Sequence, residues 1–204
     1  MPRSLRALRQ SHRVIYITML ISALLSLTAS LVLSIDAIQL AADPNAGFAC
    51  DINSVISCGT VARSWQAQLL GFPNSYLGLM AEPVVITIAV AALGGVKFPR
   101  WFMLAAQAVY TIGLVFAYWL FFQSYLVINA LCPPWCLLVT LSTTLVWTSL
   151  MHVNIRDNNL YLPQRVHRGL KAFVEADLDL LVVLVWLVFL VTLIVVKYGP
   201  ALVA

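Results

Sequence analysis

The sequence predicts an all-α integral membrane protein whose chain crosses the bilayer five times. Of its 204 residues, 62% are apolar and 10% are charged, whereas about 25% of residues are charged in an ordinary soluble domain. The mean hydropathy is +0.93, and a chain this short cannot bury so much apolar surface inside a globule of its own. The apolar runs long enough to span a membrane are Val14 to Ile35, Leu77 to Val96, Trp101 to Ile128, Leu131 to Met151 and Leu180 to Val196.

The first run follows a basic segment, as the core of a signal peptide does. However, Val14 to Ile35 exceeds the roughly 7–15 apolar residues of such a core, so we expect a retained helix. The second run contains Glu82 and Pro83. Because Glu82 lies near the outer end of this run, we expect an interfacial acid whose carboxylate reaches the headgroup region. A tight connection around Asn129 joins the third and fourth runs, and a polar connector, residues 152–179, precedes the fifth.

The basic residues indicate how the chain is oriented. All but two fall on one side of the five expected spans, and the opposite side holds only Arg63 and Lys197. Since Lys and Arg are enriched in cytoplasmic loops, we expect a cytoplasmic amino terminus, an extracytoplasmic carboxyl terminus and an extracytoplasmic loop over residues 36–75. These loops account for the net charge of +4, so we expect no nucleic-acid partner. The residues on the basic side are Arg3, Arg6, Arg9, Arg13, Lys97, Arg100, Arg156, Arg165, Arg168 and Lys171.

Four cysteines, Cys50, Cys58, Cys132 and Cys136, lie at or near the predicted outer face, where disulfides are permitted. They form two pairs on separate elements, an arrangement typical of a redox relay. Two static disulfides are the alternative, although a bridge that closes so short a loop as the second pair would constrain little. A zinc site is a further alternative, but these spacings fit no common zinc motif, so we expect no metal.

The second pair stands where the fourth helix is expected to begin. Two prolines follow Cys132 in the first turn, where a missing backbone N–H is tolerated. The unpaired N–H groups of a helix start favour a thiolate, the nucleophilic form of cysteine. Cys136 follows one turn later, and Thr140 and Thr143 continue the same face. We therefore expect a redox-active sulfur facing a mostly apolar cavity.

The first pair lies in the long loop. Residues 54–70 place Cys58, Val61, Trp65 and Leu69 on one face of a short helix, which would aim Cys58 inward and end at Gly71. Cys50 precedes that helix, and we expect it to be mobile and exposed to solvent. An outer thiol and an inner thiol of this kind would form a shuttle.

Four segments of the chain together resemble a bacterial member of the vitamin K epoxide reductase family. They are CDINSVISC (Cys50 to Cys58), the serine at Ser64, GFPNSYLG (Gly71 to Gly78) and NALCPPWC (Asn129 to Cys136). The resemblance covers Val14 to Met151. It implies a four-helix bundle around a quinone over residues 1–151, the cytoplasmic connector 152–179 and a fifth helix over residues 180–204.

The resemblance also implies roles for single residues. Cys50 would be the outer shuttle cysteine, Cys58 the inner one, and Cys132 and Cys136 the active-site pair. Cys136 would face the quinone, with Ser64 and Asn74 near the quinone pocket; the helical spacing from Cys136, rather than the resemblance, adds Thr140 to this pocket. One departure is the presence of three residues between Cys132 and Cys136 where the family usually has two. Since Pro133 biases Cys132 out of helical geometry, we still expect these two cysteines to form a disulfide in the oxidised enzyme.

The predicted function is that of a membrane thiol–quinone oxidoreductase in a bacterial plasma membrane. Electrons would pass from a thioredoxin-fold protein to menaquinone or ubiquinone, which would support disulfide formation in exported proteins. Many bacterial relatives carry that thioredoxin domain after the fifth span. Here the chain stops at Ala204, so we expect a separate DsbA-like partner. The alternatives are reduction of vitamin K epoxide or quinone proper, convergence on DsbB-like enzymes, and a transporter or structural subunit, which the acid at Glu82 keeps open.

Overall fold

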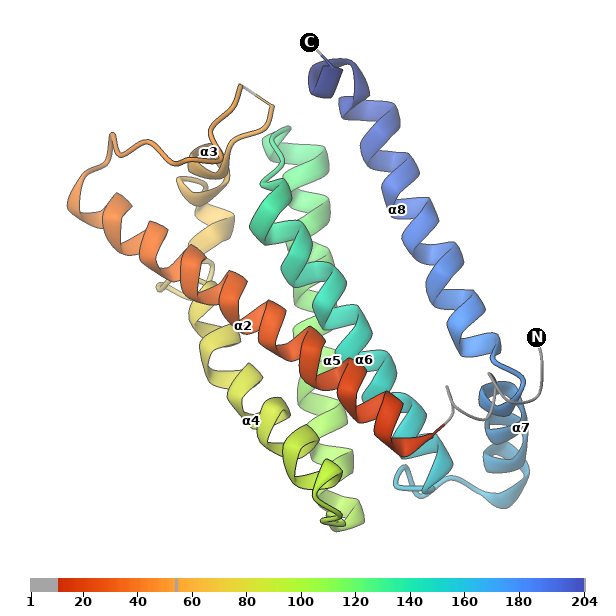
Figure 1. The fold of residues 1–204 in the computed structure, drawn as a ribbon. Coiled ribbons are helices and arrows are strands. Elements are labelled where there is room, and N and C mark those ends of the chain that lie inside the picture. Colours follow the sequence, from red (N-terminus) through yellow and green to blue (C-terminus); the bar gives the residue numbers. More distant parts are fainter. Residues whose placement is uncertain (1–10, 54, 204) are drawn as a thin grey trace.

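The computed structural model of the protein describes residues 11–53 and 55–203, and these residues form helices joined by short connections (Figure 1). Within this described part there is no β-strand, only one isolated parallel bridge between Ile56 and Leu131. In chain order, the helices are α2 (His12–Ala42), α3 (Cys58–Ala62), η1 (Trp65–Gln68), α4 (Ser75–Leu93), α5 (Arg100–Gln123), η2 (Ser124–Ile128), η3 (Pro133–Leu137), α6 (Leu138–Arg156), α7 (Gln164–Glu175) and α8 (Leu178–Val203). Helix η1 is a 3₁₀-helix, and η2 and η3 are π-helical.

Five segments of the described chain are long and apolar enough to cross a membrane. They are His12–Ala42, Ser75–Leu93, Arg100–Ile128, Trp135–Arg156 and Leu178–Gly199. Each contains most of one apolar run predicted from the sequence, so the prediction of an all-α membrane protein with five spans is confirmed. Ser11 caps the first helix by accepting the Val14 N–H through its hydroxyl, and Pro99 stands at the N-cap of α5.

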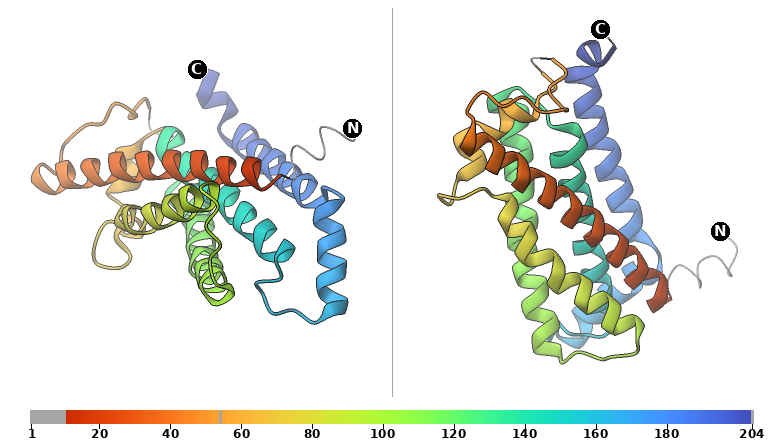
Figure 2. Two further views of the ribbon diagram at one scale, coloured as in Figure 1. Left: turned by 60° about the horizontal axis from the view of Figure 1, so that its bottom comes forward. Right: turned by 60° about the vertical axis from the view of Figure 1, so that its left-hand side comes forward.

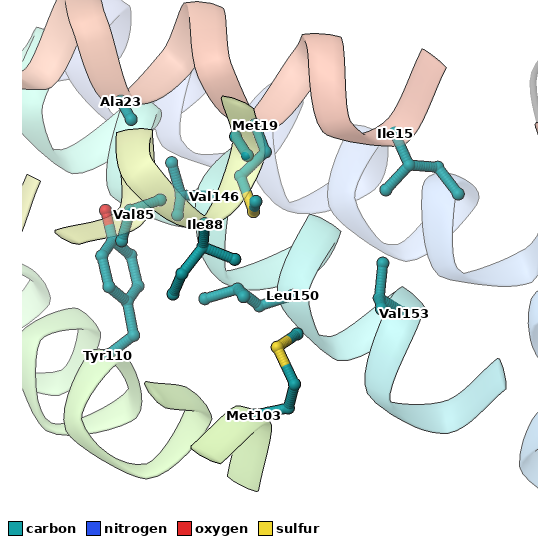
Figure 3. Close-up of a cluster of buried hydrophobic side chains, with 11 residues drawn as sticks. Ile15, Met19, Ala23, Val85, Ile88, Met103, Tyr110, Val146, Leu150 and Val153 are labelled. Atoms are coloured by element: carbon teal, nitrogen blue, oxygen red, sulfur yellow. The ribbon is translucent and has the colours of Figure 1, made fainter. Parts of the chain in front are cut away.

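Helices α2, α4, α5 and α6 make up a bundle. Helix α2 crosses the front of it and packs against α4 and α6, while α5 packs against α6 behind (Figures 1 and 2). An apolar cluster fills the half of the bundle remote from α3; Met19, Ile88, Val146 and Leu150 at its centre are at most 1% exposed (Figure 3). This cluster closes one half of the bundle.

Small residues allow α2 and α4 to approach closely. The serines at positions 22, 26, 30 and 34 recur every fourth residue along the buried face of α2, and Ser34 donates a hydrogen bond to the Ser75 hydroxyl at 2.9 Å. Gly78 of α4 lies directly against Ser30, since a Cβ atom at position 78 would lie 2.1 Å from Ser30 Oγ. Contacts of this kind are typical of membrane helices, which hydrophobicity alone does not hold together in lipid.

Helix α8 runs along one side of the bundle with most of its side chains exposed (Figure 2), as a lipid-facing span requires. Several hydrogen bonds attach it to the outer half of α5 and the connection beyond, among them two between side chains. Trp186 Nε1 donates to the Tyr118 hydroxyl at 2.8 Å, and Lys197 Nζ donates to Asn129 Oδ1 at 2.7 Å. The amphipathic helix α7 links α6 to α8 at the opposite end of the bundle (Figure 1).

Candidate active site

The connection from α2 to α3, residues 43–57, is named the shuttle loop here, and one carboxylate organises it. Asp51 Oδ1 accepts the Gly59 N–H at 2.8 Å and the Ser57 hydroxyl at 2.7 Å, and Oδ2 accepts the Phe48 N–H at 3.0 Å. Desolvation acts to raise the pKa of Asp51, but these three hydrogen bonds and the charge of Arg63 outweigh it and hold the pKa below its ordinary value. The carboxylate therefore fixes the start of α3.

Arg63 fastens the other side of this loop. Its guanidinium donates from Nε to the Pro44 carbonyl at 3.1 Å and from Nη2 to the Ala46 carbonyl at 2.7 Å. Arg63, at the end of α3, thus holds the first part of the shuttle loop, and Asp51 holds the part that precedes α3. Along the chain, Cys50 lies between these two attached parts.

A short backbone ladder brings the two cysteine pairs together. Ser57 N–H donates to the Leu131 carbonyl at 3.0 Å, and Leu131 N–H donates to the Val55 carbonyl at 2.7 Å. These two bonds form the parallel bridge between Ile56 and Leu131. Because each strand-like segment runs directly into a cysteine, Cys58 and Cys132 are placed side by side.

That placement also brings the sulfur atoms close together. Cys50 and Cys58 are joined in a disulfide, and the Cys58 and Cys132 sulfurs lie 2.7 Å apart. The sulfurs of Cys50, Cys58 and Cys132 all lie within 4.8 Å of one another, but two of them are bonded to each other and are not free thiolates. A thiol adjacent to a disulfide is the geometry that thiol–disulfide exchange needs.

The inner pair begins on a π-helical turn rather than on a regular helix. In η3, the Cys132 carbonyl accepts the Cys136 N–H at 3.1 Å and the Leu137 N–H at 3.4 Å. A π turn accommodates one more residue than an α-helical turn does. The third intervening residue between Cys132 and Cys136 is therefore absorbed by the backbone, and the two sulfurs remain neighbours.

The surroundings of Cys132, which lies outside the membrane-spanning segments, favour ionisation of its thiol. A hydrogen bond from the Cys136 thiol, together with the N–H groups of Cys136 and Trp135, lowers the pKa of Cys132 against the effect of burial. The side chain is only 1% exposed. The thiol next to the Cys50–Cys58 disulfide therefore ionises more readily than an ordinary cysteine.

A cavity of about 240 Å³ opens beneath these sulfurs, between α2, α4, α5 and α6. Its walls are mostly apolar, and all three residues expected in the quinone pocket line it: Ser64, Asn74 and Thr140. Cys136 and Cys58 line it as well, whereas Cys50 and Cys132 do not. One mostly apolar cavity with a few polar groups and a redox sulfur is the form that cofactor sites take in helical bundles.

The polar groups of the cavity differ in what they can still bind. Ser64 donates its hydroxyl to the Val61 carbonyl at 2.6 Å, and Thr140 donates to the Cys136 carbonyl at 3.0 Å. Asn74 donates one N–H to the Gln66 carbonyl at 2.6 Å, which leaves its second N–H, and its buried Oδ1 has no hydrogen-bond partner. The Asn74 amide thus fits a ligand that carries a carbonyl or hydroxyl oxygen, such as a quinone.

Glu82 and Tyr110 line the same cavity, and sequence reasoning did not assign them there. Glu82 is 3% exposed, so the expectation of an interfacial carboxylate is wrong. The Tyr110 side chain extends from α5 toward α4 (Figure 3), and its hydroxyl donates to Glu82 Oε1 at 2.9 Å. Hydropathy gives the depth of an acid along a span but not the side of the helix on which it lies, and only its position among apolar residues could have drawn attention to it.

The structure corrects two further expectations. Cys50 is 8% exposed, because the shuttle loop folds over it, so it is not a solvent-facing thiol. The helix expected over residues 54–70 is broken after Ala62, where Ser64 is extended and the 3₁₀-helix η1 begins; Trp65 consequently points outward and is 64% exposed. Cys132 and Cys136 are free thiols in this structure, which therefore represents a state with the inner pair reduced, and their disulfide in the oxidised enzyme stays a prediction.

The helical membrane bundle and its clustered cysteines, two bonded and two free, define the class of membrane thiol oxidoreductases. Comparison with protein families gives the particular family: the model of the vitamin K epoxide reductase family matches residues 17–151. This match covers well over half of the chain, and the protein belongs to that family. Comparison with curated proteins and with solved structures finds no match.

Proposed function

We propose that this protein is a thiol–quinone oxidoreductase that reoxidises a DsbA-like thioredoxin-fold protein. The observation that carries the proposal is the position of Cys136. It lines the cavity from below the sulfur cluster, while its neighbour Cys132 lies 2.7 Å from the shuttle disulfide. Electrons entering at the shuttle loop would thus reach the cavity through adjacent sulfurs.

The relay proceeds by two exchanges. A reduced partner attacks the Cys50–Cys58 disulfide at Cys50; resolution of that mixed disulfide oxidises the partner and leaves two thiols. Cys58 then attacks Cys132 of an inner disulfide and releases Cys136, and Cys50 attacks Cys58 and releases Cys132. The product has an outer disulfide and two inner thiols, which is the redox state of this structure.

The lowered pKa of Cys132 supports the direction of the last step. In thiol–disulfide exchange the thiol of lower pKa leaves faster, so Cys50 displaces Cys132 from the Cys58–Cys132 mixed disulfide. When bound in the cavity, a quinone accepts two electrons and two protons. Cys132 and Cys136 would supply the electrons by closing their own disulfide.

We place this chemistry outside the cytoplasm, in a bacterial plasma membrane. The basic residues of the loops support that orientation, since Lys97, Arg100 and Arg156 lie at the ends of helices remote from the shuttle loop. Cytoplasmic loops carry the excess of Lys and Arg. Disulfides persist in the compartment on the opposite side.

The proposal is tested with purified protein, a reduced DsbA-like protein, and ubiquinone or menaquinone in detergent. We expect oxidation of the partner that requires quinone and yields one quinol per disulfide formed. A protein with static disulfides, such as a transporter, would oxidise no partner. That outcome would overturn the proposal.

Cys136→Ser provides a sharper test of the electron path. This variant cannot form the inner disulfide that Cys58 attacks, so turnover should stop with the Cys50–Cys58 disulfide intact and Cys132 unlinked. Acid-quenched alkylation followed by peptide mass spectrometry identifies the linked peptides. In Cys50→Ser, by contrast, Cys58 can still attack Cys132 of the quinone-oxidised inner pair, but no Cys50 thiol displaces Cys132, so a Cys58–Cys132 mixed disulfide should accumulate. If Cys132 were found unlinked in every variant, the relay would not run as proposed.

A further inference from the structure

Glu82 is a carboxylic acid in the interior of a membrane-spanning helix. It lies in the first half of α4 (Ser75–Leu93), is 3% exposed, and is followed by Pro83, which interrupts the helical hydrogen bonding. Ionisable side chains are costly inside a bilayer and are retained there for function. The relay of thiols described above makes no use of this acid.

The surroundings of Glu82 contain hydroxyl groups and no positive charge. Tyr110 donates to Oε1 at 2.9 Å, and Oε2 has no hydrogen-bond partner. Among the described residues, no Lys, Arg or His forms an ion pair with this carboxyl group. The Ser26 hydroxyl lines the same cavity and lies close to this carboxyl group. A carboxyl group in such a setting is not half of a salt bridge, and one of its oxygens is still available to a ligand.

The position of Glu82 relates it to the redox sulfur. Both Glu82 and Cys136 line the cavity described above. Glu82 stands eight residues after Asn74 on α4, a rise of roughly 12 Å at about 1.5 Å per residue. Helical side chains tilt toward the helix amino terminus, so the Glu82 side chain inclines toward the Asn74 end. The cavity therefore has a thiol at its outer end and an acid at its inner end.

We propose that Glu82, held by the Tyr110 hydroxyl, is the acid that protonates a carbonyl oxygen of the quinone as Cys132 and Cys136 reduce it. This inference rests on the proposed function. It assigns to Glu82 a catalytic role and to Tyr110 a positioning role. Asn74, at the other end of the cavity, would bind the second oxygen through its free amide group.

The step balances in atoms and electrons. The Cys132 thiolate and the Cys136 thiol lose two electrons as the bond between their sulfurs forms. One proton comes from the Cys136 S–H bond and the other from the Glu82 O–H bond, and both form new O–H bonds on the quinone oxygens. The products are the inner disulfide, a quinol and the Glu82 carboxylate. The proton that Cys132 released to solvent when it became a thiolate then returns to Glu82.

The test compares Glu82→Gln with Glu175→Gln. Glutamine keeps the size of the side chain but has no acidic proton, and Glu175, the other glutamate of the chain, lies on α7 away from the cavity. In single-turnover reactions of the reduced protein, we expect Glu82→Gln to slow quinol formation about a hundredfold, a typical loss for a general acid. Glu175→Gln should match the unmodified protein. Exchange between the partner dithiol and the Cys50–Cys58 disulfide should be equally fast in all three.

A second readout does not depend on turnover. In infrared difference spectra, quinone binding should perturb the carbonyl stretch of a protonated carboxyl group, and Glu82→Gln should abolish that band. Tyr110→Phe should shift the band without removing it, because the acid remains but loses its donor. A band that survives in Glu82→Gln would assign the signal to another acid and overturn the inference.

The outcomes separate this inference from the proposed function. If the unmodified protein does not reduce quinone, the proposed function fails. If the unmodified protein reduces quinone and Glu82→Gln does so at the same rate, the relay stands and Glu82 is not the proton donor. If Glu82→Gln does not fold, it will lack the Cys50–Cys58 disulfide and will not bind quinone, and both losses can be measured. Tyr110→Phe then provides the test, because we expect it to slow quinol formation and to shift the infrared band of the carboxyl group.

Discussion

A single exposed carboxylate, Asp51, connects two parts of the shuttle loop with the start of α3. It accepts hydrogen bonds from Phe48, Ser57 and Gly59, and two of these groups flank Cys58. The carboxylate thus acts as a cap for α3, which has only five residues and would not be stable in isolation. The orientation of Cys58 toward Cys132 depends on this cap.

We expect Asp51→Asn to loosen the start of α3 by about 1 kcal/mol, as the loss of a helix cap does. Amide hydrogen exchange at Gly59 measures this loosening. In the unmodified protein the pKa of Asp51 is lowered, so protection should be complete above the ordinary pKa of aspartate and be lost as the pH falls through the lowered value. Asp43→Asn is the control, because the Asp43 carboxylate accepts the Asn45 N–H, which lies outside α3. Equal protection of Gly59 in Asp51→Asn would contradict this account.

Residue identity could be predicted from the sequence more completely than residue environment. The spacing of the cysteines indicated two pairs. The motifs placed Ser64 and Asn74, and helical spacing placed Thr140, near one pocket, whose walls they do line. The burial of Cys50 depends on how the loop folds over it. The partner of Glu82 is 28 residues away in the chain, and local periodicity carries no information about such a pair.

At the scale of the helical element, the π turn at the start of α6 accounts for the unusual spacing of the inner cysteines. The sequence CPPWC shows an extra residue, but not whether the helix or the loop absorbs it. The structure places it inside η3, within the turn that carries Cys136. A backbone of this kind keeps Cys132 and Cys136 adjacent without moving α6.

Deleting Pro134 should therefore convert the π turn to an α-helical turn and leave the inner pair able to form a disulfide. We expect a Cys132–Cys136 disulfide in quinone-oxidised protein both with and without the deletion. Acid-quenched alkylation and mass spectrometry measure it, with dithionite-reduced protein as the control. Free thiols in the oxidised unmodified protein, with bridging only after the deletion, would show that the insertion disables the site.

The close packing of α2 on α4 gives a second prediction at this scale. Gly78→Ala should destabilise the bundle by about 1–3 kcal/mol, typical of overpacking, because the new methyl group would overlap Ser30. Gly113→Ala in α5 is the matched control, since nothing lies within 4 Å of that position. Unfolding in detergent measures both. Adding Ser30→Gly to Gly78→Ala should restore stability, and failure to do so would place the strain elsewhere.

For the whole molecule, hydropathy was sufficient to predict the five spans, since lipid requires long apolar helices with internally satisfied backbones. Hydropathy could not predict which helices pack together. The α2–α4 contact depends on serine and glycine side chains, and hydropathy does not distinguish a face that contacts protein from one that contacts lipid. The attachment of α8 through Lys197 is a further long-range contact of this kind.

The orientation of the whole molecule is tested by cysteine accessibility. In a cysteine-free background, we expect Asn45→Cys to be labelled by a membrane-impermeant maleimide in intact cells. Asp157→Cys should be labelled only after the cells are opened. Both positions are exposed and lie in connections at opposite ends of the bundle. Labelling of position 157 in intact cells would reverse the orientation and exclude the proposed compartment for the relay.

The path of α8 determines where a tethered partner could operate. Its carboxyl-terminal end lies at the same end of the bundle as the shuttle loop (Figure 1), whereas α2 begins at the other end. A thioredoxin-fold domain joined there by a short flexible linker would meet Cys50 at an effective concentration in the millimolar range. Oxidation of that domain would become independent of dilution. The same domain joined before α2 would gain nothing from the linkage, since the bilayer would separate it from the sulfurs.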